Sequence, residues 1–105
     1  MGETMNININ PKKIYELVNK DVQCIDIREK YEYDDLHIKN FIHIPYEDIL
    51  SSLYLLSKDK PIYIICQHGN RAKIIAQKLR ELNYDAYYID GGFQAFLHIP
   101  PDKYY

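Results

Sequence analysis

Several features that mark whole classes of protein are absent from this sequence. The chain has no run of Lys or Arg residues, and its net charge is -2, so it offers no basic surface for nucleic acid. No apolar stretch approaches the ~20 residues of a membrane-spanning helix, and the start of the chain lacks a secretory hydrophobic segment. We therefore expect a cytoplasmic protein that binds neither nucleic acid nor membranes.

Cysteine is also scarce, with only Cys24 and Cys66 in the chain. Each lies within or ends an apolar, strand-like run, so in a chain without a leader we expect reduced thiols rather than a disulfide. A zinc site built from Cys66 and His68, with His37 or His43, has neither a second cysteine pair nor regular ligand spacing. We therefore expect no metal.

Internal repeats, linkers and low-complexity segments are missing as well. A length of 105 residues suits one domain, and an apolar fraction of 47% is enough to build a core without a metal or disulfide. We expect a single domain over 1–105. Its core covers about 5–98, and a short C-terminal tail covers 99–105.

Apolar runs of strand length alternate with helix-like segments along the chain. The helix after residue 10 has Asn10 as its N-cap and Pro11 at its first position, and Asn83 suits the left-handed residue that ends a later helix. The alternation predicts an α/β fold, with a mainly parallel central sheet of about five strands flanked by helices. Strands are expected over 6–10, 22–27, 41–44, 61–65 and 85–89, helices over 11–19, 46–56 (one helix or two short ones), 71–82 and 93–97, and a loop with at most one helical turn over 28–36.

The most informative stretch is the loop that follows the strand over 61–65. Cys66 ends this buried strand, and a helix begins a few residues later, so free backbone N–H groups at the helix start point back at the sulfur. Surroundings of this kind favour a nucleophilic thiolate. Gly69 allows the loop to curl into a ring of N–H groups, and Arg71 adds a fixed positive charge. The plain alternative is that Cys66 is a small buried core residue.

The loop Cys66-Gln67-His68-Gly69-Asn70-Arg71 resembles the six-residue active-site loop of the rhodanese family of sulfurtransferases. The resemblance extends in the right order over about 5–98. It includes the segment 24–29 with Glu32-Tyr33 and His37-Ile38, then Ile44-Pro45, and the closing segment 89–96 with its two glycines. The departures, among them Leu36, Asn40, Phe41, Ala72 and Phe96, remove neither the cysteine nor the loop glycine.

The resemblance implies a three-layer rhodanese-like fold and a two-step sulfur transfer. Cys66 takes sulfur from a small donor such as thiosulfate or a persulfide, and a thiol or cyanide-like acceptor then removes it from the resulting persulfide. A sulfur-relay protein is a possible further partner. No metal or organic cofactor is implied. The amides of Gln67 to Arg71, including those of His68, Gly69 and Asn70, are expected to surround the transferred sulfur.

Two residues at the end of the strand over 22–27 are expected beside this loop. Asp26 is interpreted as an acceptor that orients Arg71 or the loop amides. Arg28 either reaches the substrate mouth or pairs with Glu29 or Glu32. For His68, contact with substrate, proton abstraction from a thiol and plain solvation all remain open.

Two other functions are compatible with the same loop. Cysteine-dependent phosphatases and arsenate reductases use a similar thiolate and arginine, but they place one residue more between the two than the four found here. The shorter loop favours a ring fitted to sulfur. A rhodanese-like module that binds a partner without catalysis is the second alternative, and the presence of Cys66, Gly69 and Arg71 argues against it.

Overall fold

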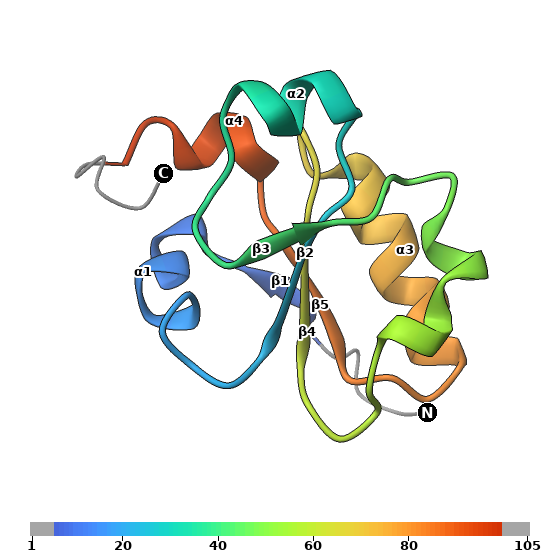
Figure 1. The fold of residues 1–105 in the computed structure, drawn as a ribbon. Helices are drawn as coiled ribbons and strands as arrows, with labels where there is room; N and C mark the ends of the chain where they lie inside the picture. The colour runs from blue at the N-terminus through green and yellow to red at the C-terminus, as the bar shows by residue number, and fades with distance from the viewer. Residues whose placement is uncertain (1–5, 100–105) are drawn as a thin grey trace.

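The computed structural model describes residues 6–99, which form a five-stranded parallel sheet between two layers of helices (Figure 1). The strand order is β1-β5-β4-β2-β3. This arrangement confirms the predicted α/β fold. The predicted tail lies outside the described residues apart from Ile99, as does residue 5. The strands are β1 (Asn8–Ile9), β2 (Gln23–Asp26), β3 (Phe41–His43), β4 (Ile62–Ile65) and β5 (Ala86–Ile89).

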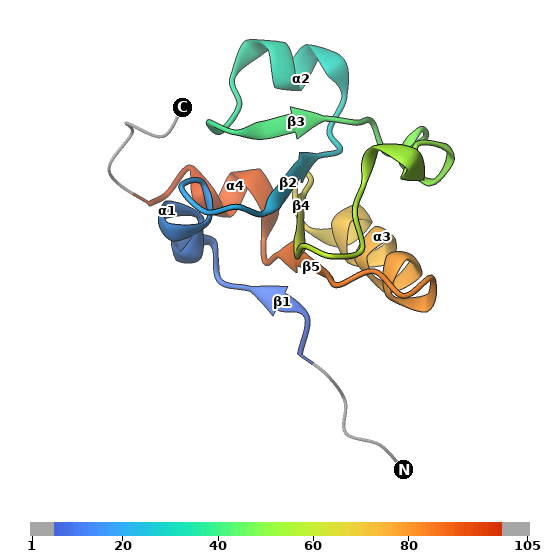
Figure 2. The same ribbon diagram turned by 60° about the horizontal axis from the view of Figure 1, so that its bottom comes forward.

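Helices cover both faces of the sheet. Figure 2 shows α1 and α4 on one side of the strands and α3 on the other. None of the helices within residues 6–99 is long and apolar enough to cross a membrane. The helices are α1 (Ile14–Leu17), α2 (Lys30–Asp35), α3 (Asn70–Glu81) and α4 (Gly92–Phe96), with short 3-10 helices η1 (Pro11–Lys13), η2 (Ile49–Ser51) and η3 (Leu53–Leu55).

The central strand β4 is buried on both faces. Its side chains alternate between the two layers, so Ile62 and Ile64 pack against α3 while Ile65 packs among the residues of α1 and α4. Each of these three isoleucines is 0% exposed. This double burial explains the continuous apolar run in the sequence, and it fixes the position of Cys66, the next residue along the chain.

Two segments differ in detail from the prediction, and a third takes one of its two predicted forms. The helix expected over 11–19 is a 3-10 turn followed by one α-turn, although the Asn10 side chain caps it by accepting from the Lys12 amide at 3.0 Å. The segment over 46–56 forms two 3-10 helices, one of the two forms expected. The segment over 28–36 contains α2, which buries none of its residues and is held by a capping box between Glu29 and Glu32.

Candidate active site

The sulfur of Cys66 lies at the start of α3, directly after β4. Two backbone amides donate to Sγ, from Gly69 at 3.0 Å and from Ala72 at 3.3 Å. Gly69 is among the expected donors, but Ala72 lies beyond the expected range of Gln67 to Arg71. The physical reason is that α3 begins at Asn70, so the amide of Ala72 belongs to the first turn and has no partner within the helix. The helix itself therefore supplies one of the two donors.

The loop can curl around Sγ because residue 69 is glycine. Gly69 has φ +101°, in the left-handed region that residues with a side chain avoid. A Cβ atom at this position would also lie 3.1 Å from the amide nitrogen of Gly91, closer than ordinary packing allows. Backbone conformation and lack of space both require glycine here.

The other side of the loop is held by the start of α4. The Phe93 amide donates to the Cys66 carbonyl at 2.8 Å, and the Gln94 amide donates to the Gln67 carbonyl at 3.1 Å. A Cβ on Gly92, at φ +66°, would come within 2.8 Å of the Gln67 carbonyl group. Because α4 binds two carbonyl groups of the loop, it holds the loop in the conformation in which the amides of Gly69 and Ala72 point toward the sulfur. In the sequence, Gly91 and Gly92 are noted only as part of the closing segment 89–96, without a role in holding the loop.

A cavity of about 340 Å³ opens over Cys66. One wall is the loop itself, and the opposite wall is formed by the end of β2 and by α2. Gly69 and Asp26 do not line it, whereas the other predicted site residues do. Sequence reasoning missed the acidic and aromatic residues of the second wall, because α2 was expected to be mostly loop. The lining residues are Ile27, Arg28, Glu29, Tyr31, Glu32, Cys66, Gln67, His68, Asn70 and Arg71.

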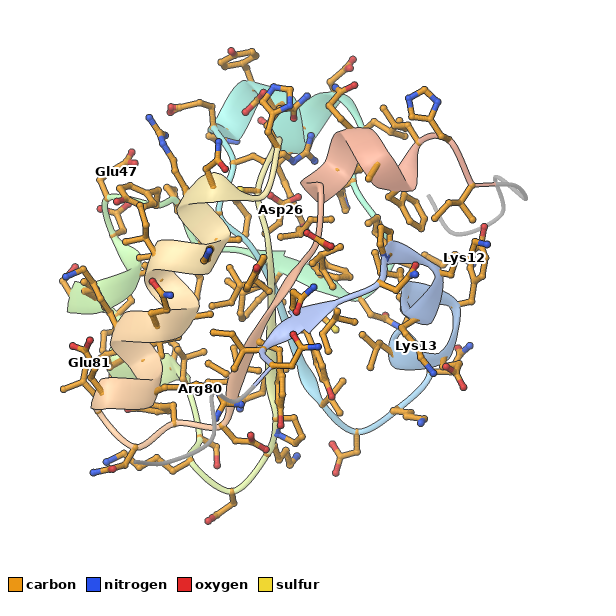
Figure 3. All side chains as sticks on the ribbon, turned by 180° about the vertical axis from the view of Figure 1, so that it is seen from behind. Lys12, Lys13, Asp26, Glu47, Arg80 and Glu81 are labelled. Carbon is orange, nitrogen blue, oxygen red and sulfur yellow. The ribbon has the colours of Figure 1, made fainter. Side chains whose placement is uncertain are left out.

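Asp26 and Arg28 form a buried ion pair behind this wall. The guanidinium Nη2 of Arg28 lies 2.9 Å from Oδ2 of Asp26, and its Nε lies 3.1 Å from both carboxylate oxygens. Figure 3 shows Asp26 inside the protein, at the end of the sheet near α2. The expected partners were therefore wrong, since Asp26 does not bind Arg71 and Arg28 pairs with neither Glu29 nor Glu32. Residues two apart in an extended chain point the same way, which brings these two side chains together.

Further contacts fix the guanidinium of Arg28 in place. Its Nη2 also donates to the Leu36 carbonyl at 2.7 Å, and its Cζ lies 3.9 Å from the centre of the Phe93 ring. Arg28 lines the cavity, but its charge is neutralised by Asp26. Of the two roles left open for it, Arg28 reaches the cavity, whereas its ion pair is with Asp26 and not with Glu29 or Glu32.

Arg71 is the cation of the loop. Its guanidinium lies 5.0 Å from the centre of the Tyr46 ring, within the range of a cation–π contact. Among residues 6–99, no carboxylate lies within ion-pair distance of it. His68 is exposed beside it at the cavity. Arg71 therefore presents an unneutralised positive charge beside Cys66.

His37 and His43 are hydrogen-bonded residues that stack on Tyr33. The Nδ1 atom of His37 lies 2.8 Å from the Tyr33 carbonyl, and Nε2 of His43 lies 2.8 Å from the Arg28 carbonyl. Their rings stack on the Tyr33 ring at 3.8 and 4.8 Å. Both histidines thus have hydrogen-bond partners on the protein backbone. Within the described part of the chain, no three His, Cys, Asp or Glu side chains gather where they could hold a metal ion.

The second cysteine lies in the other layer of the core. Cys24 is buried with residues of α1 and α4, whereas Cys66 belongs to the cluster on the α3 face. Both thiols are free, as expected. Burial raises the pKa of Cys24 from 9.0 to about 12. Cys24 is therefore a buried thiol of the core.

Residues 10–98 match the family model described as Rhodanese-like domain. The thiosulfate sulfurtransferase GlpE of Coxiella burnetii is 30% identical over 90 residues, covering 84% of this chain and 84% of that protein. The adenylyltransferase and sulfurtransferase uba4 of Aspergillus fumigatus is 34% identical over 90 residues, covering 65% of this chain. The chain spans only 18% of the length of uba4.

Solved structures give the same result. Reduced CoADR-RHD of Bacillus anthracis superimposes with a TM-score of 0.81 at 33% identity, covering 87% of this chain and 16% of that one. A rhodanese-related protein of Thermoplasma volcanium has a TM-score of 0.79 at 31% identity, covering 87% and 90% of the two chains. Sequence and structure comparisons both agree with the resemblance predicted from the residues.

Proposed function

Because this chain belongs to the rhodanese-like domain family, we propose that it is a sulfurtransferase that carries sulfane sulfur on Cys66. The observation that carries the proposal is the pair of amides, from Gly69 and Ala72, that donate to Sγ of Cys66 below an open cavity. Hydrogen bonds to an anionic sulfur are stronger than those to a neutral one, so this arrangement favours a thiolate that attacks and later leaves.

The first step loads the cysteine. The Cys66 thiolate attacks the outer, sulfane sulfur of a donor such as thiosulfate or a persulfide. A bond forms between Sγ and that sulfur, and the bond to the rest of the donor breaks, so the remainder leaves with the electron pair. Arg71, which no carboxylate among residues 6–99 neutralises, supplies positive charge near an anionic donor or leaving group.

The second step returns the cysteine to its starting form. A thiol or cyanide-like acceptor attacks the outer sulfur of the Cys66 persulfide, and Cys66 leaves as a thiolate. The amides of Gly69 and Ala72 stabilise this leaving group by the same contacts that favour it as a nucleophile. The cycle transfers one neutral sulfur atom and needs no metal or organic cofactor.

The wider setting is part of the proposal. We expect a cytoplasmic protein, since both cysteines are free thiols and a reducing compartment preserves that state. Similarity to uba4, whose name combines adenylyltransferase and sulfurtransferase, supports a sulfur-relay protein as a further partner. The single-domain GlpE relatives support exchange with small molecules.

The test is intact-mass spectrometry after incubation with thiosulfate or a small persulfide and removal of the excess donor. The native protein is expected to gain one reducible sulfur atom. Cys66→Ser should gain none, and Cys24→Ala, which alters the buried thiol in the other core layer, should still gain one. A protein that gains no sulfur from any such donor is better described as a non-catalytic binding module.

A further inference from the structure

A second cavity of about 410 Å³, between α2 and α4, adjoins the cavity over Cys66. The two cavities share Arg28, Tyr31, Glu32 and Gln67 in their walls, and the second extends past Asp35 and Leu36. Together they have the size of sites that bind small organic molecules, which measure ~300–1,000 Å³. A sulfur oxyanion of a few atoms fills only a small part of this space, so the site has room for an organic thiol beside the sulfur carried on Cys66.

The charges along these cavities are mostly negative. Glu29, Glu32 and Asp35 line them, and none of the three is in an ion pair with another residue of the range 6–99. Arg28 adds no net charge because it is paired with Asp26. Among the described residues that line the cavities, Arg71 is the one Lys or Arg without a carboxylate partner. Unpaired negative charges along the cavities thus outnumber unpaired positive charges.

Helix α2 has one more carboxylate, Asp34, and it shows that the excess of unpaired negative charge is confined to the side of the helix that faces the cavities. Asp34 lines neither cavity and pairs with Lys30 at 2.6 Å. Tyr31, in contrast, is 75% exposed and lines both cavities. An exposed aromatic ring among unpaired carboxylates is a surface that attracts a cation, because the ring face and the carboxylates are all negative.

We propose that the sulfur acceptor is an aminothiol, a small thiol that carries a positively charged ammonium group. This inference rests on the proposed sulfurtransferase function and narrows its acceptor. The ammonium group lies among Glu29, Glu32, Asp35 and the Tyr31 ring, and the sulfur reaches the Cys66 persulfide over Gln67. An acceptor that carries a carboxylate instead is repelled by the same wall.

The transfer itself involves no net oxidation. The aminothiol reacts as its thiolate and attacks the outer sulfur of Cys66–S–SH. A new S–S bond forms to the acceptor, the S–S bond to Sγ breaks, and its electron pair stays on Cys66 as the thiolate. The product is the persulfide of the aminothiol, with the proton retained on its outer sulfur.

The experiment compares two small thiols of opposite charge, cysteamine and mercaptoacetate. Sulfur-loaded native protein is mixed with each at equal thiolate concentration, which removes the difference in ionisation. Loss of the added sulfur is followed by mass over time. The same thiols are also reacted with a small persulfide in solution, which gives their intrinsic rate ratio.

The ratio of the cysteamine rate to the mercaptoacetate rate is expected to be about tenfold higher with the protein persulfide than with the small persulfide. This advantage should fall with added salt. The double variant Glu32→Gln/Asp35→Asn should reduce this advantage at least about threefold. A glutamine at residue 32 still suits the capping box, so α2 is retained. Asp34→Asn is the matched control on the same helix and should leave the advantage unchanged.

The outcomes separate the two proposals. A protein that never loads sulfur on Cys66 overturns both of them. A protein that loads sulfur but discharges it to the two thiols in the intrinsic ratio overturns only the aminothiol acceptor. The same holds if the double variant and Asp34→Asn behave alike.

Discussion

The pair of Asp26 and Arg28 places two opposite charges in the interior, with side chains only 1% and 3% exposed. Removing one member of such a pair leaves an uncompensated buried charge. We therefore expect Asp26→Ala to lower the free energy of unfolding by about 3–5 kcal/mol, measured by urea denaturation. The loss of Arg28's anchor should also reduce sulfur loading, because Arg28 lines the cavity.

A surface pair provides the comparison. Lys60 and Asp21 lie 2.8 Å apart, with side chains 46% and 85% exposed. Asp21→Asn should change the free energy of unfolding by less than about 1 kcal/mol, as is usual for an exposed ion pair. Equal effects of Asp26→Ala and Asp21→Asn would contradict the role given to burial.

Gly92 tests how the loop is held. The variant Gly92→Ala would bring a Cβ within 2.8 Å of the Gln67 carbonyl group and would force alanine into a left-handed conformation. Backbone strain of this kind amounts to about 1–3 kcal/mol, and the loop must shift to relieve the clash. We expect Gly92→Ala to unfold at a lower urea concentration than the native protein. We also expect it to load less sulfur than its loss of folded protein explains. A variant of equal instability that is altered far from the loop should still load sulfur, and if it does not, instability alone explains the loss.

The sequence predicted the shape of the Cys66 loop better than the side chains around it. A loop between Cys66 and a helix, curled at Gly69, could be predicted because a strand end, a glycine and a helix start are local features. The partner of Asp26 could not, since several charged side chains nearby were equally plausible and only the observed packing selects Arg28. The Ala72 amide was missed because its role depends on the residue at which α3 begins.

At the scale of elements, the end of α3 shows a local signal that was sufficient. Asn83 has φ +72°, as expected for the left-handed residue that follows a helix. We expect Asn83→Gly to leave the free energy of unfolding nearly unchanged and Asn83→Ala to lower it by about 1 kcal/mol. Thermal denaturation of the two variants checks this. An alanine variant as stable as the glycine variant would show that the backbone conformation contributes nothing.

Helix α2 shows the opposite case. It has no buried residue, so the sequence carries no apolar period to reveal it. Its N-cap is Glu29, which is not among the residues favoured at that position. Only the capping box with Glu32 marks its start, and the helix supplies the second wall of the cavity. The acidic side of the site was therefore missed along with the helix.

For the molecule as a whole, the sheet divides the core into two layers and separates the two thiols. Because burial raises the pKa of Cys24 to about 12, this thiol stays protonated at neutral pH, and thiolates rather than thiols react with alkylating reagents. We expect iodoacetamide to modify Cys66 in the folded protein well before Cys24, as shown by peptide mapping. Equal labelling of both cysteines would contradict the separation. In urea both should react.

The same thiol gives a prediction for the dependence of stability on pH. The folded protein holds the Cys24 proton more tightly than the unfolded chain, whose pKa is near 9.0. The stabilising effect is therefore complete below about pH 9 and is lost as the pH rises toward about 12. Urea denaturation at neutral pH and at a pH above 9.0 should show a smaller loss of stability for Cys24→Ala than for the native protein. Tyrosines and lysines that ionise in the same range are present in both proteins, and the pKa of Tyr63 is raised by burial and further by the Cys24 thiolate, so a common slope would contradict the prediction.

The positions of the strands along residues 6–99 could be predicted because strands buried on both faces appear as continuous apolar runs. The pairing of β1 with β5 could not be deduced from β1 itself, since that strand has only two residues, Asn8 and Ile9. Its place at the edge depends on hydrogen bonds to a strand about eighty residues later in the chain. The parallel arrangement followed from the helices between strands.

The attachment of the Cys66 loop to α4 has a consequence for synthesis on the ribosome. The amides that bind the loop carbonyls belong to Phe93 and Gln94, which are translated well after Cys66. A growing chain therefore exposes its cysteine before the segment that shapes the loop has emerged. The loop takes its final geometry only after Phe93 and Gln94 have left the ribosome, so a translation product that ends between Cys66 and these residues carries the thiol without that geometry.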